Sequence, residues 1–173
     1  NPKVVGSNPA PATNNKPYEG FFYRRKMDTN YLKEILTEDI QSLGCDIWGI
    51  ELFGSYKNQT LRIYIDNKDG ISLEDCEKVS KHVVKLLDVE NNFSNKYLLE
   101  VSSPGLERKF FSKDQYSAYI NCAIKVRYIN DFNKKTSLKG ILSNVTKEDL
   151  LIKSGDKAQT IPFSSIIQAN LIM

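Results

Sequence analysis

The stretch Tyr97-Leu98-Leu99-Glu100-Val101-Ser102-Ser103-Pro104-Gly105-Leu106-Glu107-Arg108 divides the chain into two parts of different character. Proline fixes its own φ near −65°, and glycine accepts the positive φ that a type II turn requires. Ser103-Pro104-Gly105 therefore ends the preceding strand-like run, Lys96–Ser102. We expect an interdomain turn over residues 103–109, between a domain at 27–102 and a second domain at 110–173.

Two helices are predicted on the N-terminal side of this turn. The first begins near Asp28 and ends at Gly44, and the second begins at Ser72, with Asp75 three residues later at the spacing of a capping box. Each carries apolar residues at spacings of three and four, which is typical of an amphipathic helix. These residues are Leu32, Ile35, Leu36, Ile40 and Leu43 in the first helix, and Cys76, Val79, Val83, Leu86 and Leu87 in the second.

The same region contains two further strand-like runs, Asp46–Phe53 and Thr60–Asp66. The polar link 54–59 between them favours a hairpin. The order is therefore helix, strand, strand, helix, strand. Because two amphipathic helices need one apolar sheet face to cover, this order predicts a two-layer α/β domain within an α+β protein.

The last third of the chain has many short strand candidates. A short helix is expected over Ser112–Ile120, with Ser112 and Gln115 at capping-box spacing. The strands separated by turn signals are Ala123–Ile129, Ser137–Val145, Leu150–Lys153, Gln159–Pro162 and Ile166–Ile172. Five short strands in so few residues favour a small closed barrel, in which Gly140 allows a sharp bend.

Charge is distributed unevenly along the chain. Residues 27–108 carry nine Lys/Arg and fifteen Asp/Glu, a net charge of −6, whereas residues 109–173 carry ten and five, a net charge of +5. The basic part is suited to phosphate and the acidic part to a basic protein. The alternative is that either set of charges serves only solubility.

Residues 1–26 lack apolar periodicity and are rich in Pro and Asn. We expect this segment to be disordered, or an extension upstream of a native start at Met27. A basic arm that touches RNA through Arg24-Arg25-Lys26 is the alternative interpretation.

The sequence lacks the patterns of secreted, membrane and metal-binding proteins. No run approaches the roughly 18 apolar residues of a membrane span, and no signal-peptide layout is visible, so a cytoplasmic location is expected. Three widely separated cysteines, Cys45, Cys76 and Cys122, predict buried reduced thiols. We expect no cofactor and no metal.

The usual signatures of catalysis are also missing. Phosphate loops, dinucleotide glycine fingerprints and the HExxH and GxSxG motifs do not occur. The only histidine, His82, has no nucleophile partner in a motif, so a structural or surface role is expected. Residues 66–70 resemble a calcium loop but lack its first and last ligands. We therefore expect no enzymatic activity.

The stretch around Pro104 is similar to the signature of the RimP family, in which a third strand runs into an S-S-P-G-x-[DE]-R segment. Further resemblance lies in Gly70-Ile71-Ser72-Leu73-Glu74-Asp75-Cys76, Leu87-Asp88-Val89, Trp48-Gly49-Ile50-Glu51 and Ile161-Pro162-Phe163-Ser164-Ser165-Ile166 followed by Ala169. It covers residues 27–173. One departure is Lys109, where the family commonly has Pro; the extra φ freedom predicts a less rigid joint.

The resemblance implies an α/β domain followed by an Sm-like barrel, and a factor for maturation of the 30S ribosomal subunit. It also implies a small-subunit precursor as partner, through 16S rRNA and a basic ribosomal protein near the decoding centre, and a monomer. The alternative function is a general RNA-binding module that uses the basic barrel.

Two groups of residues are the candidate sites. The interdomain motif comprises Glu100, Ser102, Ser103, Pro104, Gly105, Glu107 and Arg108. We expect Arg108 to pair with Glu100 or Glu107 and to fix the angle between the domains. Lys125 and Arg127 share one strand face, with Lys139 on the next strand, and are expected to contact RNA or a ribosomal protein. A solvated barrel face is the alternative.

Overall fold

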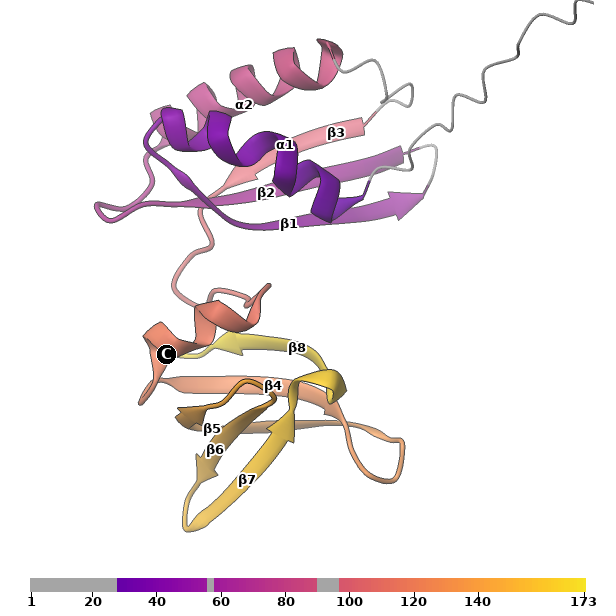
Figure 1. The fold of residues 1–173 in the computed structure, drawn as a ribbon, viewed down its shortest axis with the longest axis vertical. Coiled ribbons are helices and arrows are strands. Elements are labelled where there is room, and N and C mark those ends of the chain that lie inside the picture. The colour runs from indigo at the N-terminus through magenta and orange to yellow at the C-terminus, as the bar shows by residue number, and fades with distance from the viewer. Residues whose placement is uncertain (1–27, 56–57, 90–96) are drawn as a thin grey trace, which may run out of the picture.

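The structure is a computed structural model that describes residues 28–55, 58–89 and 97–173. The expectations for residues 1–26, for Met27 as the start and for Lys96 lie outside these ranges. Figure 1 shows two units joined by one connection, which follows β3.

The N-terminal unit is a three-stranded sheet with two helices on one face (Figure 1). Its elements are α1 (Thr29–Ser42), β1 (Asp46–Ser55), β2 (Asn58–Asp66), α2 (Leu73–Val89) and β3 (Tyr97–Ser102). The strand order is β1-β2-β3, antiparallel between β1 and β2 and parallel between β2 and β3. The predicted order of elements and two-layer arrangement are confirmed. The β1–β2 link is shorter than expected, since pairing continues to Ser55 and Asn58.

Both predicted helix starts form their caps. The Asp28 carboxylate accepts a hydrogen bond from the Asn30 amide at 3.3 Å. Ser72 and Asp75 cap each other, because the Ser72 Oγ accepts from the Asp75 amide at 3.1 Å and the Asp75 carboxylate accepts from the Ser72 amide at 3.0 Å. His82 Nε2 lies 2.8 Å from the Asp39 carboxylate and thereby links the two helices, which supports its structural role.

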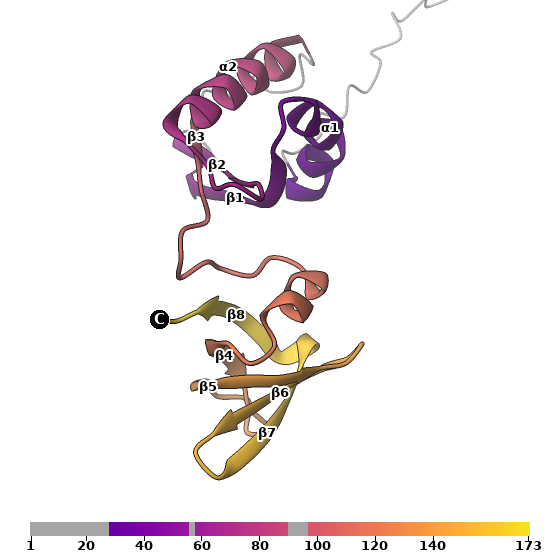
Figure 2. The same ribbon diagram turned by 90° about the vertical axis from the view of Figure 1, so that its left-hand side faces the viewer.

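Apolar residues from both helices meet the sheet in one core. Its fully buried side chains are Leu32, Leu36, Ile40, Leu61, Ile63, Ile65, Val79 and Val83. The remaining predicted stripe residues are buried or partly buried around them. The opposite face of the sheet carries no helix, and it faces the C-terminal unit (Figure 2).

The C-terminal unit is a five-stranded antiparallel sheet with strand order β7-β6-β5-β4-β8. Its elements are η1 (Lys113–Tyr119), β4 (Ala123–Ile129), β5 (Lys135–Val145), β6 (Asp149–Ser154), β7 (Lys157–Pro162), η2 (Phe163–Ser165) and β8 (Ile166–Leu171). All five predicted strands occur. Pairing between the end strands β7 and β8, which a closed barrel requires, is not recorded within residues 97–173.

The position of Gly140 is set by close approach of two strands. A Cβ at this residue would lie 2.3 Å from the Lys153 backbone oxygen on β6. Glycine therefore permits β5 and β6 to cross closely near the irregular register between Leu142 and Asn144.

The prediction of buried thiols is right for Cys45, whereas Cys76 is half-buried and Cys122 is exposed. Cys122 lies in the turn between η1 and β4, where its amide donates to the Tyr119 carbonyl. Because this turn lies at the protein surface, the general tendency of free cysteines to be buried does not hold for Cys122.

Tyr116 occupies the aromatic centre of the C-terminal core. Its ring stacks on Phe110 with centroids 4.1 Å apart and meets the edge of Phe163 at 5.5 Å. Burial raises the pKa of Tyr116 to about 12, because the phenolate is poorly solvated there.

This shift predicts alkaline destabilisation. The folded-state pKa lies above the unfolded value near 10, so the stabilisation is complete below pH 10 and is lost as pH rises toward 12. At pH 11 the loss from this group is about 1 kcal/mol. Urea unfolding of wild type and Tyr116→Phe at pH 9 and pH 11 measures it. An equal fall in stability for both proteins would contradict the assignment.

Candidate functional site at the domain junction

The chain crosses between the units through residues 103–107 and then joins the C-terminal sheet (Figure 2). Gly105 has φ of +70°, the left-handed conformation that the predicted turn requires of it. Beyond the turn, the Arg108 carbonyl accepts from the Leu171 amide at 3.0 Å and the Phe110 amide donates to the Ala169 carbonyl at 2.9 Å. The connection is therefore anchored along β8.

Trp48 reaches from the N-terminal sheet into the hydrophobic core of the C-terminal unit. It is the extra residue of a β-bulge, because the register of β1 against β2 shifts between Ile47 and Gly49. A bulge redirects a side chain out of the normal alternation. The Trp48 ring packs against the C-terminal core, with centroids 6.0 Å from Tyr119 and 6.3 Å from Phe110.

The Trp48 indole is also held by a hydrogen bond across the junction. Its Nε1 donates to the Lys109 carbonyl at 2.7 Å. Because a half-buried indole N–H needs a partner, this bond fixes both the ring and the linker backbone.

Arg108 is the central charged residue of the junction. Its NH1 binds the Asp66 carboxylate at 2.6 Å and the Tyr119 hydroxyl at 3.0 Å, and its Nε donates to the Gly105 carbonyl at 3.1 Å. The guanidinium lies 4.8 Å from the Trp48 ring centroid, within reach of a cation–π interaction. Both charged side chains are largely buried, with 19% and 24% exposed.

The expected pairing of Arg108 with Glu100 or Glu107 is therefore wrong. Glu100 lies opposite Arg62 in the parallel register of β2 and β3 and binds it at 2.6 Å. Hydrogen bonds with Tyr64 and Glu100 raise the pKa of Arg62. Glu107 is exposed, and its backbone carbonyl accepts from the Asn170 side chain at 3.3 Å. The β2–β3 register sets Glu100 opposite Arg62. Asp66 lies at the end of β2, beyond the residues paired with β3, and binds Arg108 instead.

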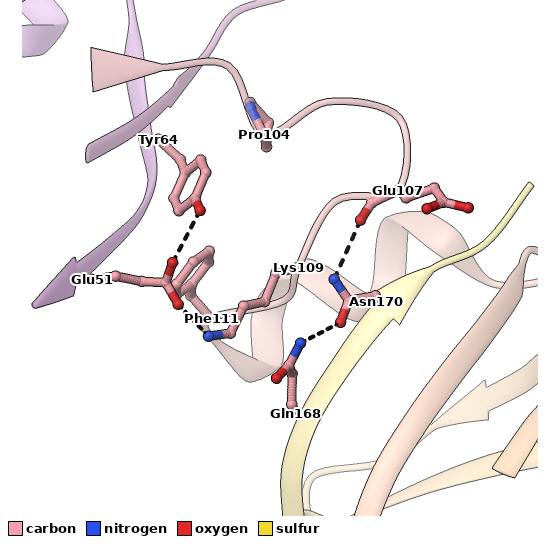
Figure 3. Close-up of a pocket in the computed structure, with 8 residues that line it drawn as sticks. All are labelled: Glu51, Tyr64, Pro104, Glu107, Lys109, Phe111, Gln168 and Asn170. Carbon is pink, nitrogen blue, oxygen red and sulfur yellow. Dashed lines mark hydrogen bonds and ion pairs between the residues drawn. The ribbon is translucent and has the colours of Figure 1, made fainter. Parts of the chain in front are cut away.

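Lys109 adds a second ion pair between the units, with Glu51 of β1 (Figure 3). Its Nζ also lies 5.1 Å from the Phe111 ring centroid. Burial acts to raise the pKa of Glu51, but hydrogen bonds from Lys109 and Tyr64 outweigh it and hold that pKa below its ordinary value. The residue expected to loosen the joint thus supplies a contact that a proline lacks.

Gln115 forms hydrogen bonds with both sides of the junction. Its Oε1 accepts from the amides of Phe111 and Ser112 at 2.7 and 3.1 Å, which is the predicted cap of η1. Its Nε2 donates to the Trp48 carbonyl at 2.6 Å. The same side chain therefore starts η1 and attaches it to β1.

A polar cleft of about 280 Å³ opens between the units beside these contacts (Figure 3). It is lined by Glu51, Tyr64, Pro104, Glu107, Lys109, Phe111, Gln168 and Asn170. Pro104 is the motif residue that forms its wall. Ser102 and Ser103 are exposed, and the Ser102 hydroxyl donates to the Ser103 carbonyl at 3.1 Å. The lining offers amide and carboxylate groups to a polar ligand.

The cleft continues into an exposed basic sheet face. In the register of the sheet, Lys125 of β4 lies opposite Lys139 of β5 and Asn170 of β8. Arg127 lies opposite Gln168 of β8. The three basic side chains are exposed and share one face of the sheet. The structure thus brings the three predicted contact residues together, next to two residues that line the cleft.

Sequence reasoning missed most of the junction. Trp48, Glu51, Asp66, Gln115 and Tyr119 hold it, and none belongs to the predicted motif. The one signal available in the sequence was Trp48, the single tryptophan, which lies in the first strand. The partner of Arg108 had no local signal, because 42 residues separate it from Asp66.

A comparison with known protein families matches residues 35–107 to the RimP N-terminal domain. The match includes the second half of α1, all of α2, the three-stranded sheet and the turn through Pro104. Residues 35–107 therefore form a RimP N-terminal domain, which supports the resemblance to the RimP family. This family is one of ribosome maturation factors associated with the small ribosomal subunit, and it is not known as an enzyme family.

Metal-binding clusters and membrane-spanning helices are both absent from the part of the chain that the structure describes. No group of three or more His, Cys, Asp or Glu side chains there is placed to hold a metal ion. No described helix has the length and apolar character needed to cross a membrane.

Arg108→Ala should loosen the junction. It removes a charged hydrogen bond in a largely buried setting and should lower the free energy of unfolding by about 2 kcal/mol. The radius of gyration from small-angle scattering should increase, and emission of Trp48, the single tryptophan, should shift to the red. Arg62→Ala is the matched control, because its ion pair lies within one sheet and should leave both readouts unchanged. Unchanged scattering and emission in Arg108→Ala would contradict the role.

Gly49→Ala tests the contact between β1 and Phe111. An added Cβ would lie 2.1 Å from the Phe111 ring, so the ring must leave its site. We expect a loss of about 2 kcal/mol in urea unfolding. In a Phe111→Ala background the same substitution should cost much less, because its steric partner is gone. Additive losses would show that the two residues do not interact.

Proposed function

We propose that this protein is a maturation factor for the 30S subunit, which it binds through immature 16S rRNA and a basic ribosomal protein near the decoding centre. The observation that carries the proposal is a basic sheet face beside a firmly held junction, in a chain with a RimP N-terminal domain. The cytoplasm is the proposed location, and a monomer without metal or cofactor is the proposed active form.

The RNA contacts are assigned to Lys125, Arg127 and Lys139. None of the ion pairs recorded among the described residues uses these side chains, so their charges are available to phosphates. Strands in a sheet lie about 4.8 Å apart, so Lys125 and Lys139, which lie opposite each other on neighbouring strands, present two positive charges close together. Each phosphate neutralised makes binding more sensitive to salt.

The acidic N-terminal unit is the proposed contact for the basic ribosomal protein. Its helices carry several exposed carboxylates, of which Glu77 is paired with Lys81: Glu34, Glu38, Glu74, Glu77 and Asp88. Such a surface repels phosphate and attracts a basic partner. The interdomain motif around Pro104 and Arg108 would then set the angle between the two contact surfaces.

We further propose that residues 27–102 and 110–173 are two domains, the second an Sm-like barrel. The short strands, the 3₁₀ turn η2 before β8 and the strong curl of the sheet in Figure 1 support a barrel of this type. A general RNA-binding module is the second candidate function, which the basic face alone would equally serve.

Sedimentation of cell extracts distinguishes the two functions. A maturation factor should travel with small-subunit precursors and be depleted from mature 70S particles, and a null strain should accumulate 30S precursors. Lys125→Ala with Lys139→Ala should weaken particle binding and reduce the salt slope by about 1 per lost phosphate contact. Lys147→Ala with Lys157→Ala, equal in charge and away from this face, is the control.

Two results would overturn the proposal. One is a null strain with a normal 30S profile. The other is equal affinity of the purified protein for precursor particles and for unrelated RNA, which would favour the general RNA-binding module.

A further inference from the structure

The loop between β4 and β5 presents an exposed aromatic ring. Phe132 is 82% exposed, and the loop projects beyond the body of the C-terminal unit (Figure 1). A single exposed apolar side chain is ordinary on a protein surface, so a binding role for Phe132 depends on how the loop holds the ring and on the charges beside it.

The loop holds Phe132 in a defined position. The Asn130 Oδ1 accepts hydrogen bonds from the amides of Phe132 and Lys134 at 3.1 and 3.0 Å. The Asn130 amide donates to the Lys134 carbonyl at 3.0 Å, and Asn133 takes a left-handed φ of +57° that closes the turn. Because the backbone is ordered before binding, a ligand that contacts the ring has less conformational entropy to remove.

Basic residues lie close to the ring in the sequence. Lys134 and Lys135 follow Phe132 after one residue, Asn133. Lys135 lies opposite Ile129, two residues beyond Arg127 on β4. All three basic side chains are exposed, and Asp131 is the only acid in the loop. The basic face described above therefore continues to the base of the loop that carries Phe132.

We propose that Phe132 is a stacking platform for an unpaired base of single-stranded RNA, with Lys134 and Lys135 at the flanking phosphates. Proteins bind single-stranded RNA by this combination of an aromatic ring and a positive track, and every base offers a π face. A protein partner is disfavoured, because charged and amide side chains rather than apolar ones flank the ring. The inference rests on the proposed RNA binding and assigns the loop to unpaired segments.

The test measures binding of the full chain to a fluorescent 12-nucleotide poly(U) RNA by anisotropy. Phe132→Ala should weaken binding about ten-fold, since one base stack is lost. Phe132→Tyr should stay within about two-fold of wild type, and Phe132→Leu should weaken like Phe132→Ala. The slope of binding against salt should not change in these variants, because no charge is removed. Leu73→Ala, a removal of another exposed apolar side chain, is the control.

The outcomes separate this inference from the proposed function. Wild-type affinity in Phe132→Ala, or full rescue by Phe132→Leu, would overturn the stacking platform while leaving RNA binding through the sheet face in place. Absence of binding by the wild-type chain to both poly(U) and precursor rRNA would overturn both. Normal thermal unfolding of each variant shows that the measured loss is one of binding.

Discussion

The structure depends on the contact of Arg108 with Asp66 above the Trp48 ring. The guanidinium belongs to the linker, the carboxylate to the end of β2, and the ring to a bulge in β1 that packs into the C-terminal core. A charge that is mostly removed from water requires its partner to stay in place. The ion pair therefore fixes the direction in which the linker leaves the N-terminal sheet, and with it the position of the second unit.

This joint gives the protein two electrostatically distinct surfaces at a set distance. The acidic helices lie on the outer face of the N-terminal sheet, and the basic strands lie on the other unit (Figure 1). In the proposed function, RNA and a basic protein are bound at the same time, and the cost of aligning the two contacts is reduced because their geometry exists beforehand. The cleft beside Lys109 lies between the two units, on the side of the N-terminal sheet that carries no helix (Figure 2).

Lys109 illustrates how one position can stabilise a joint by different means. A proline there would restrict φ, whereas the lysine pairs with Glu51 and covers Phe111. Rigidity from a backbone ring does not depend on salt, but rigidity from an ion pair is weakened by screening. The joint of this protein should therefore respond to ionic strength more than a joint with proline.

The sequence by itself determined the local structure. Apolar spacing, capping pairs such as Ser72 and Asp75, and turn residues specified both helices and all eight strands to within a few residues, since these signals act between near neighbours. It also placed Lys125 and Arg127 on one strand face, because side chains alternate along a strand, whereas the register that sets Lys139 opposite Lys125 is a property of the folded sheet. Only the tertiary structure decided the junction: Asp66 as the partner of Arg108, the insertion of Trp48, and the parallel register that gives Glu100 to Arg62. These contacts join residues dozens of positions apart, and no local rule encodes which of fifteen acids in the acidic region meets a given arginine.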